Sequence, residues 1–196
     1  MMSQIKIFIS YCHKNEDEAK RVDEFLIANN IKATIDSRDL GYTKDIKDFM
    51  RTIKDHDFTL MLISDAYLKS GNCIFEILQV MNQEEYQNKI LPIVLDDARI
   101  YNPIESIDYT IYWNDQYKAL ESKAEGIDSI AVIPIFTELQ KWKYAFYEIA
   151  KFIDTLKYMK NLSYRHLLHN GYIELLGRID KPSPKALQQI KPTLPK

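Results

Sequence analysis

Short apolar strands alternate with amphipathic helices through the first two thirds of this chain, and this alternation constrains the fold more than any other feature. Helices between strands place successive strands parallel in one sheet. The alternation therefore predicts an α/β fold with a five-stranded, doubly wound parallel sheet of the flavodoxin type. The expected strands are Ile5–Ser10, Ile31–Asp36, Phe58–Ile63, Lys89–Leu95 and Tyr109–Trp113.

Apolar residues at helical spacing predict the helices around this sheet. The first helix opens at Asn15–Glu18, two residues spaced like a capping box. A long helix is expected over Glu138–Lys160, followed by two short helices at Ser163–Leu168 and Tyr172–Ile179. The pattern of residues 114–133 predicts no regular element.

Size and charge narrow the class of protein. The 196 residues suit one domain with an extension, and 26 Lys and Arg against 28 Asp and Glu give a formal net charge of −2. That near balance argues against nucleic-acid binding through bulk charge. With two cysteines, no leader-like start and no apolar run long enough for a bilayer, the sequence predicts a cytoplasmic protein without membrane contact.

Several familiar chemistries lack their motifs. The five glycines form neither a dinucleotide-binding GxGxxG nor a phosphate-binding GxxxxGK[ST], and no GxSxG elbow occurs. Two cysteines are too few for a structural zinc site, and HExxH is absent, so no metal is expected. His166 and His169 are interpreted as a surface or packing pair.

Ligands of doubly wound sheets bind beyond the carboxyl ends of the strands. The residues that follow each strand are therefore the candidates for a site, which is expected at one edge of the sheet. These segments are Ser10–His13, Asp36–Tyr42, Ser64–Ser70 and Asp96–Asp97.

Three of these boundaries carry motifs of one known family. Phe8-Ile9-Ser10-Tyr11 ends the first strand, Asp36 leads into Ser37-Arg38-Asp39-Leu40-Gly41, and Ser70-Gly71-Asn72-Cys73-Ile74-Phe75-Glu76 opens a helix. In this order and spacing they resemble the Toll/interleukin-1 receptor (TIR) domain over roughly residues 4–115. The resemblance implies a TIR domain over 1–133 and a helical extension over 134–180 similar to those of stand-alone bacterial TIR proteins. The last 15 residues hold four of the seven prolines and no acidic residue, so residues 181–196 are expected to form a Pro- and Lys-rich tail or linker.

The resemblance implies an NAD+ glycohydrolase or cyclase whose catalytic residue is Glu76. Breaking the bond between ribose and cationic nicotinamide creates an oxocarbenium-like ribose, which one carboxylate can stabilise. Nicotinamide leaves as a neutral molecule, so no general acid is needed. The implied products are nicotinamide and either ADP-ribose or a cyclic isomer, with NAD+ as substrate and no cofactor.

The same resemblance implies the substrate-binding residues. They end the first strand, form a mobile wall after the second strand, or stand close to Glu76: Ser10, Tyr11, Cys12, His13, Asp36, Arg38, Leu40 and Cys73. Taken alone, the two cysteines fit small packing residues, Arg38-Asp39 fits an exposed loop pair, and His13 fits a surface helix cap as well as a pocket.

Family enzymes work as assemblies in which the loop of one subunit completes the pocket of another. The resemblance thus implies other TIR domains as partners, in a homo-oligomer formed on activation. A downstream effector that senses the product would be a further partner, and anti-phage immunity in bacteria is the expected setting.

A non-catalytic TIR scaffold is the alternative interpretation. A glutamate near a helix start is favoured by the helix dipole, and Glu76 can belong to a solvated stripe with Asn72, Gln79 and Gln83. Asn72 also replaces a Trp found in many TIR domains, which puts substrate stacking in doubt. The loop after the second strand lacks the Gly- and Pro-rich sequence of signalling adaptors, which counts mildly against a pure scaffold.

A phospho-receiver shares this topology but fits poorly. It needs an acceptor Asp at the end of the third strand and a Lys after the fifth. Asp65 lies two residues past Ile63, and Asn114-Asp115 follow the predicted fifth strand instead of a lysine.

Overall fold

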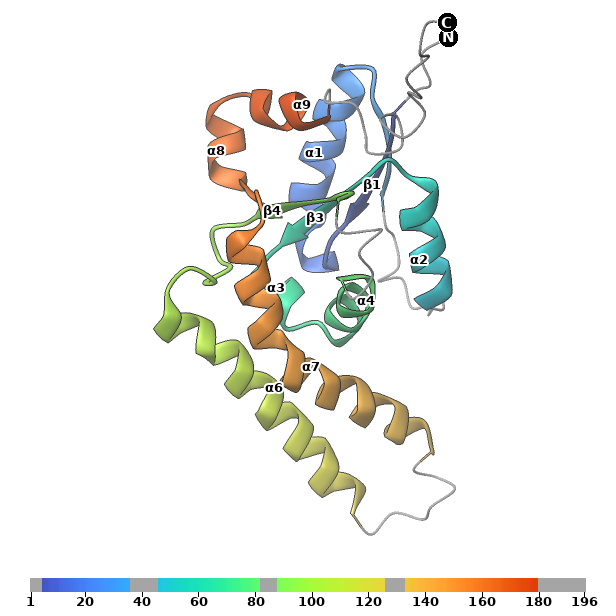
Figure 1. Cartoon of the computed structure of the whole chain (residues 1–196), viewed down its shortest axis with the longest axis vertical. Coiled ribbons are helices and arrows are strands. Elements are labelled where there is room, and N and C mark those ends of the chain that lie inside the picture. Colours follow the sequence, from blue (N-terminus) through green and yellow to red (C-terminus); the bar gives the residue numbers. More distant parts are fainter. Residues whose placement is uncertain (1–4, 36–45, 82–87, 126–132, 180–196) are drawn as a thin grey trace, which may run out of the picture.

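Five strands form one sheet in the order β2-β1-β3-β4-β5, and every pairing is parallel (Figure 1). The computed structural model describes residues 5–35, 46–81, 88–125 and 133–179, with only the backbone for 46–50, 133 and 134. The strand order confirms the predicted flavodoxin-like α/β fold. The strands are β1 Lys6–Ser10, β2 Lys32–Ile35, β3 Phe58–Ile63, β4 Ile90–Val94 and β5 Leu162–Ser163.

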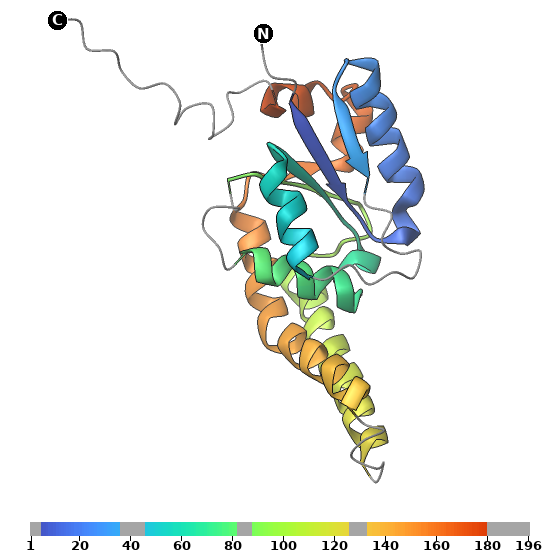
Figure 2. The same ribbon diagram turned by 90° about the vertical axis from the view of Figure 1, so that its right-hand side faces the viewer.

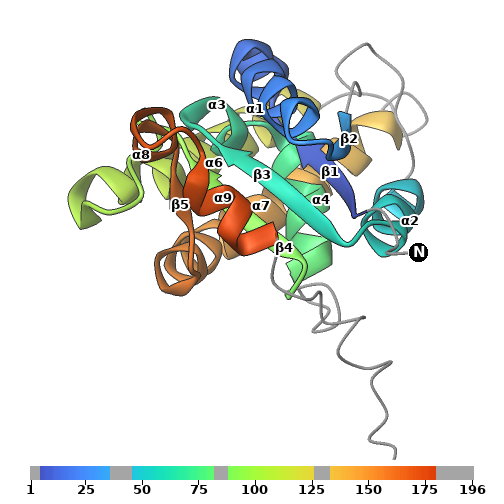
Figure 3. The ribbon, with the colours of Figure 1, turned by 90° about the horizontal axis from the view of Figure 1, so that it is seen from above.

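Helices cover both faces of the sheet, and Figure 3 shows the strands in the middle with helices around them. The helices of the described residues are η1 His13–Asn15, α1 Glu16–Ala28, α2 Ile46–Asp55, α3 Asp65–Leu68, α4 Gly71–Met81, α6 Pro103–Ala124, α7 Ile133–Tyr158, α8 Tyr164–His169 and α9 Ile173–Ile179.

Alternation along each strand divides the core into two clusters, because successive side chains point to opposite faces of a sheet. On β1, Phe8 joins the cluster under α2, α4, α6 and α7, whereas Ile7 and Ile9 join the cluster under α1, α8 and α9. On β3, Met61 and Ile63 face the first group of helices, and Phe58, Leu60 and Leu62 face the second. Both faces are therefore buried, which explains why β3 is apolar at five of its six positions.

The predicted strand at Tyr109–Trp113 is wrong, because these residues lie inside α6. Asn102 caps this helix, its Oδ1 accepting a hydrogen bond of 3.0 Å from the N–H of Ile104, and Pro103 stands in the first turn. Tyr109 and Trp113 are four residues apart and both buried, as on one face of a helix. Residues 114–124, for which the sequence predicted no regular element, continue the same helix.

The fifth strand is instead Leu162–Ser163, which pairs with β4 at Ile93 and Val94. The long C-terminal helix predicted over 138–160 is present as α7, and the two short helices are present as α8 and α9. The division of the chain at 133/134 stays a prediction.

Helices α6 and α7 pack side by side as a hairpin that extends away from the sheet (Figures 1 and 2). The buried side chains between the hairpin and the sheet include Tyr109 and Trp113 of α6 and Ala145 and Ile149 of α7. Among the described residues, no helix combines the length and the apolar character that crossing a bilayer requires.

Candidate active site

The turns after β1 and β3 are joined by one buried hydrogen bond. The hydroxyl of Ser64 donates to Oδ1 of Asn15 at 2.5 Å and accepts from the N–H of Tyr67 at 2.9 Å, which caps α3. The predicted capping box survives only as a 3.4 Å contact between the side chains of Asn15 and Glu18, because the amide oxygen of Asn15 is engaged by Ser64. The carboxyl edge of the sheet is thereby held by residues 49 apart in sequence.

The four predicted substrate residues after β1 do not share one face. Ser10 and Cys12 are each only 4% exposed, and Cys12 belongs to the core on the α4 side. Tyr11 packs against the opposite cluster, because the backbone is still extended at Cys12 and side chains alternate. His13 is exposed, with its Nδ1 3.8 Å from the Cys12 sulfur.

Three predicted substrate residues, Asp36, Arg38 and Leu40, lie outside the described residues. The predicted stripe on α4 is described except for Gln83. Asn72 is exposed, whereas Glu76 and Gln79 are both partly buried. The stripe is therefore not uniformly solvated, and its carboxylate, Glu76, is partly shielded from solvent.

Helix α4, which carries Glu76, is held by packing against the core and by a hydrogen bond at its N-terminus. Ile74 and Ile77 are fully buried, and Cys73 packs against the same core cluster as Cys12. At the N-terminus, the Ser70 hydroxyl accepts a 3.4 Å hydrogen bond from the N–H of Cys73. Each of these contacts limits how far the backbone around Glu76 can shift.

The helical hairpin presses directly on the start of α4. A Cβ at Gly71 would lie 3.1 Å from Nε1 of Trp142 and 3.7 Å from the Trp113 ring. The two indoles meet edge to face, with centroids 6.4 Å apart, and Trp113 donates to the carbonyl of Leu68 at 3.0 Å. Glycine is thus the residue that lets the hairpin approach α4 this closely.

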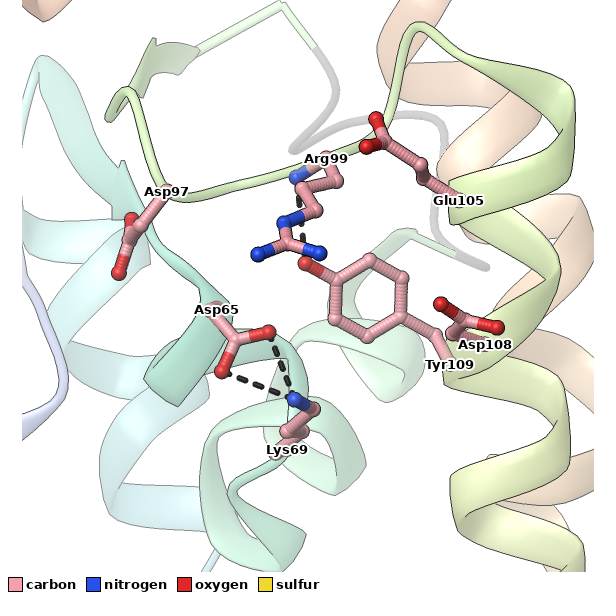
Figure 4. A pocket seen from close by; sticks show the side chains of 7 residues that line it. All are labelled: Asp65, Lys69, Asp97, Arg99, Glu105, Asp108 and Tyr109. Atoms are coloured by element: carbon pink, nitrogen blue, oxygen red, sulfur yellow. Dashed lines mark hydrogen bonds and ion pairs between the residues drawn. The ribbon is translucent and has the colours of Figure 1, made fainter.

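A second feature of the carboxyl edge is a charged pocket of about 270 Å³ between α3, the segment after β4, and α6 (Figure 4). At its base Lys69 forms an ion pair with Asp65, at 2.8 Å and 3.0 Å to the two carboxylate oxygens. The hydroxyl of Tyr109 accepts a 3.2 Å hydrogen bond from the N–H of Arg99. The lining residues are Asp65, Lys69, Asp97, Arg99, Glu105, Asp108 and Tyr109.

The electrostatics of this pocket are set by four carboxylates and two cations. Burial raises the pKa of the Asp97 carboxyl, although a hydrogen bond from the backbone N–H of Asp65 opposes that shift. Burial also raises the pKa of the Tyr109 phenol. Within the described residues, no group of three acidic, histidine or cysteine side chains is arranged to hold a metal ion.

Three residues of this pocket lie where the sequence predicts a site. Asp65, Lys69 and Asp97 lie in the segments expected to follow β3 and β4. The residues of α6 were missed because Tyr109–Trp113 was interpreted as a strand; the Asn102-Pro103 start signal could have placed them. Glu76 is not among the residues that line the pocket.

The sheet order and the helices on both faces define a parallel α/β domain with a charged pocket at its carboxyl edge. The chain belongs to the TIR domain family, whose model matches residues 7–130. This match confirms the resemblance inferred from the three strand-end motifs.

Among solved structures, the chain is similar to the TIR domains in the structure of the activated Roq1 resistosome directly recognizing the pathogen effector XopQ. Identity is 16%, the TM-score is 0.45, and the likeness covers 75% of this chain and 84% of that chain. This likeness is too distant to assign an activity. No curated protein matches the chain.

Proposed function

We propose that this TIR domain cleaves NAD+ at the bond between nicotinamide and ribose, with Glu76 as the catalytic carboxylate. Membership of the TIR family supports the reaction class, and the position of Glu76 in the Cys-x-x-Glu segment of α4 supports the residue. The observation that carries the proposal is the partial burial of Glu76 on a helix that is fixed by the core and by the hairpin.

The chemistry requires little beyond one well-placed carboxylate. As the glycosidic bond breaks, its electron pair leaves with nicotinamide, which becomes neutral, and positive charge develops on the ribose. A carboxylate that is partly shielded from water stabilises such charge more strongly than a fully solvated one. Attack by water then gives ADP-ribose and a proton, whereas attack by an atom of the same nucleotide gives a cyclic isomer.

The strand-end residues on the α4 side are the better candidates for substrate contact. Ser10 and Cys12 have the same orientation as Phe8, toward the cluster against which Cys73 packs. Tyr11 packs on the opposite face, so we assign it the weakest role of the predicted set. Roles for His13, Asp36, Arg38 and Leu40 in binding NAD+ remain part of the proposal.

The wider role that we propose is antiviral immunity in a bacterial cytoplasm. The enzyme would act either by depleting NAD+ or by making a nucleotide signal that a downstream effector detects. TIR–TIR assembly would accompany activation.

The proposal is tested by measuring nicotinamide release from NAD+ by the full chain over a concentration series, with products resolved by mass. We expect Glu76→Gln to lower release by about 100-fold or more, since it removes the charge that stabilises the transition state. Glu105→Gln is the matched control: it makes the same chemical change at another partly buried carboxylate, in the charged pocket.

Two other results would contradict the proposal. Release that survives Glu76→Gln but is lost in Glu105→Gln would move the reaction to the charged pocket. Absence of release from the wild-type chain at every concentration would favour the scaffold interpretation, in which TIR–TIR assembly occurs without turnover.

A further inference from the structure

The outer face of α6 carries an exposed aliphatic stripe bordered by acidic residues. Ile104, Ile107 and Ile111 recur at helical spacing and are 80%, 55% and 50% exposed. Asp108 and Asp115 stand on the same face, three residues before Ile111 and four residues after it, and Lys118 lies on this face seven residues after Ile111. Neither aspartate forms an ion pair with another described residue. A contiguous exposed apolar surface rimmed by polar residues is a common feature of protein interaction sites.

The outer face of α7 is aromatic, with two lysines beside its central tyrosine and Asp154 on the same line seven residues after that tyrosine. Phe136, Tyr147 and Tyr158 recur every eleven residues, which places them on one line along the helix, and Tyr147 is 65% exposed. Lys143 and Lys151 stand four residues before and four residues after Tyr147, and the Lys143 ammonium lies 5.7 Å from the centre of the Tyr117 ring of α6 in the same chain. Lys151 is 76% exposed and reaches Glu148 only at 3.9 Å, so its charge is largely available to a partner.

The acidic pair of α6 and the lysine pair of α7 match in spacing. Asp108 and Asp115 are seven residues apart, or about 10 Å along a helix, and Lys143 and Lys151 are eight residues apart, or about 12 Å. When Ile111 is set against Tyr147 with the helices antiparallel, Asp108 comes level with Lys151 and Asp115 with Lys143. Apolar contact at the centre and an ion pair on each side is the usual composition of a specific protein interface.

These faces cannot meet within one chain, because α6 and α7 pack together through their inner sides, where Trp113 and Ile149 are buried. Figures 1 and 2 show the far part of the hairpin extending beyond the sheet. A second copy placed beside the first in the same orientation presents its α7 antiparallel to the first copy's α6.

We propose that the outer face of α6 in one copy binds the outer face of α7 in the next copy, through Ile111 against Tyr147 and through the pairs Asp108–Lys151 and Asp115–Lys143. The contact is heterologous, since each copy uses two different faces, and it therefore repeats into a ring or an open filament. It does not involve Glu76, it shares Asp108 with the lining of the charged pocket, and it does not depend on the proposed NAD+ cleavage.

The first test is the self-association of the full chain by sedimentation velocity over a wide concentration series. We expect the wild-type chain to associate and the double variant Asp108→Lys/Asp115→Lys to require at least about tenfold more protein, because like charges then face one another. Ile111→Asn should weaken association similarly. Ile27→Asn is the matched control, since Ile27 is 61% exposed on α1, and it should leave association unchanged.

The second test distinguishes a heterologous contact from every other arrangement. Lys143→Glu/Lys151→Glu gives both faces acidic pairs, and Asp108→Lys/Asp115→Lys gives both faces basic pairs, so each variant alone should need at least about tenfold more protein to associate than the wild-type chain. An equimolar mixture should associate as the wild-type chain does, and added salt should weaken that association. A wild-type chain that is monomeric at every concentration, or a mixture that fails to associate, would overturn the proposal; so would unchanged association of either variant alone.

Discussion

Lys89 is a buried cation whose function in the fold is to end α2. It is 7% exposed, and its Nζ donates to the carbonyl oxygens of Ile53, Lys54 and His56 at 3.2, 3.0 and 3.1 Å. These carbonyls belong to the last turn of α2 and the residue beyond it, where the helix dipole favours a positive charge. One side chain therefore couples the start of β4 to the helix that follows the predicted substrate loop.

We expect Lys89→Met to lower the free energy of unfolding by about 3 kcal/mol, since three charge-assisted hydrogen bonds are lost and their acceptors stay buried. Urea unfolding measures the change. Lys20→Met is the control: Lys20 forms an exposed 2.7 Å pair with Glu16, and because solvent screens such a pair, its loss should change stability little. Equal losses in the two variants would show that the carbonyl contacts of Lys89 contribute nothing.

Tyr172 makes stability depend on pH in alkaline solution. Burial and the neighbouring Tyr164 raise the pKa of its phenol above the ordinary value of 10.0. As pH rises past 10, the unfolded chain loses this proton before the folded chain does, so the stability present below that pH is progressively lost. We expect Tyr172→Phe to change stability little near neutral pH, because the phenol is uncharged there and the ring keeps its stacking on Phe25, and to make the chain more stable than wild type above pH 10.

Urea unfolding at neutral pH and above pH 10, with absorbance of tyrosinate followed in parallel, measures this difference. Tyr158→Phe is the control, since Tyr158 is 84% exposed. A parallel loss of stability in wild type and Tyr172→Phe would show that other groups dominate the alkaline transition.

At the scale of single residues, the sequence predicted a contact within one helical turn but not the contacts between distant segments. The Asn15–Glu18 contact was predictable because its members are one helical turn apart. The Ser64–Asn15 bond and the three carbonyls around Lys89 were not, since they join segments 33 to 49 residues apart. Glu76 was reached through the family motif, because a glutamate in the first turns of a helix fits an ordinary solvated face equally well.

Among the elements, β3 was predicted with its exact bounds because burial on both faces leaves an uninterrupted apolar run. The same criterion failed at Tyr109–Trp113, where aromatic and β-branched residues of α6 imitate a strand. The two-residue strand β5 carries no period that a sequence can show, and its pairing with β4 depends on α7 returning the chain to the sheet. Short elements defined by tertiary contacts are therefore the part of this fold that pattern cannot supply.

Gly71 tests how closely the hairpin must approach the helix that carries Glu76. A glycine-to-alanine change in a helix usually stabilises by about 0.4–1 kcal/mol where the new methyl group fits. At Gly71 the methyl group would lie 3.1 Å from Trp142 Nε1, so we expect Gly71→Ala to give no gain or a net loss, and to lower nicotinamide release if α4 shifts.

Gly177→Ala in α9 is the matched control, because a Cβ there meets nothing within 4 Å, and it should give the usual gain. Thermal unfolding of the two variants measures both effects. Equal stabilisation would mean that the indoles move aside at no cost and that the hairpin does not fix α4.

For the molecule as a whole, the family match ends at residue 130, yet both core clusters continue well beyond it. Helix α7 contributes five buried side chains to the cluster under α4, and the segment from β5 to α9 contributes six to the opposite cluster. These residues are Ala145, Ile149, Phe152, Ile153 and Leu156, and Leu162, Tyr164, Leu167, Tyr172, Leu175 and Ile179.

We therefore expect a chain that ends at residue 133 not to fold cooperatively, although it contains the whole family match. It loses the burial of eleven side chains, most of them worth about 1.5–3 kcal/mol each, which exceeds the usual total stability of about 5–15 kcal/mol. It also leaves β4 as a bare, apolar sheet edge, which favours aggregation. Far-UV circular dichroism during urea unfolding measures cooperativity, and a chain ending at residue 180 is the control, because it keeps every described contact. A cooperative transition in the 1–133 chain would instead establish that segment as a self-contained TIR domain, with α7, β5, α8 and α9 as a separable extension.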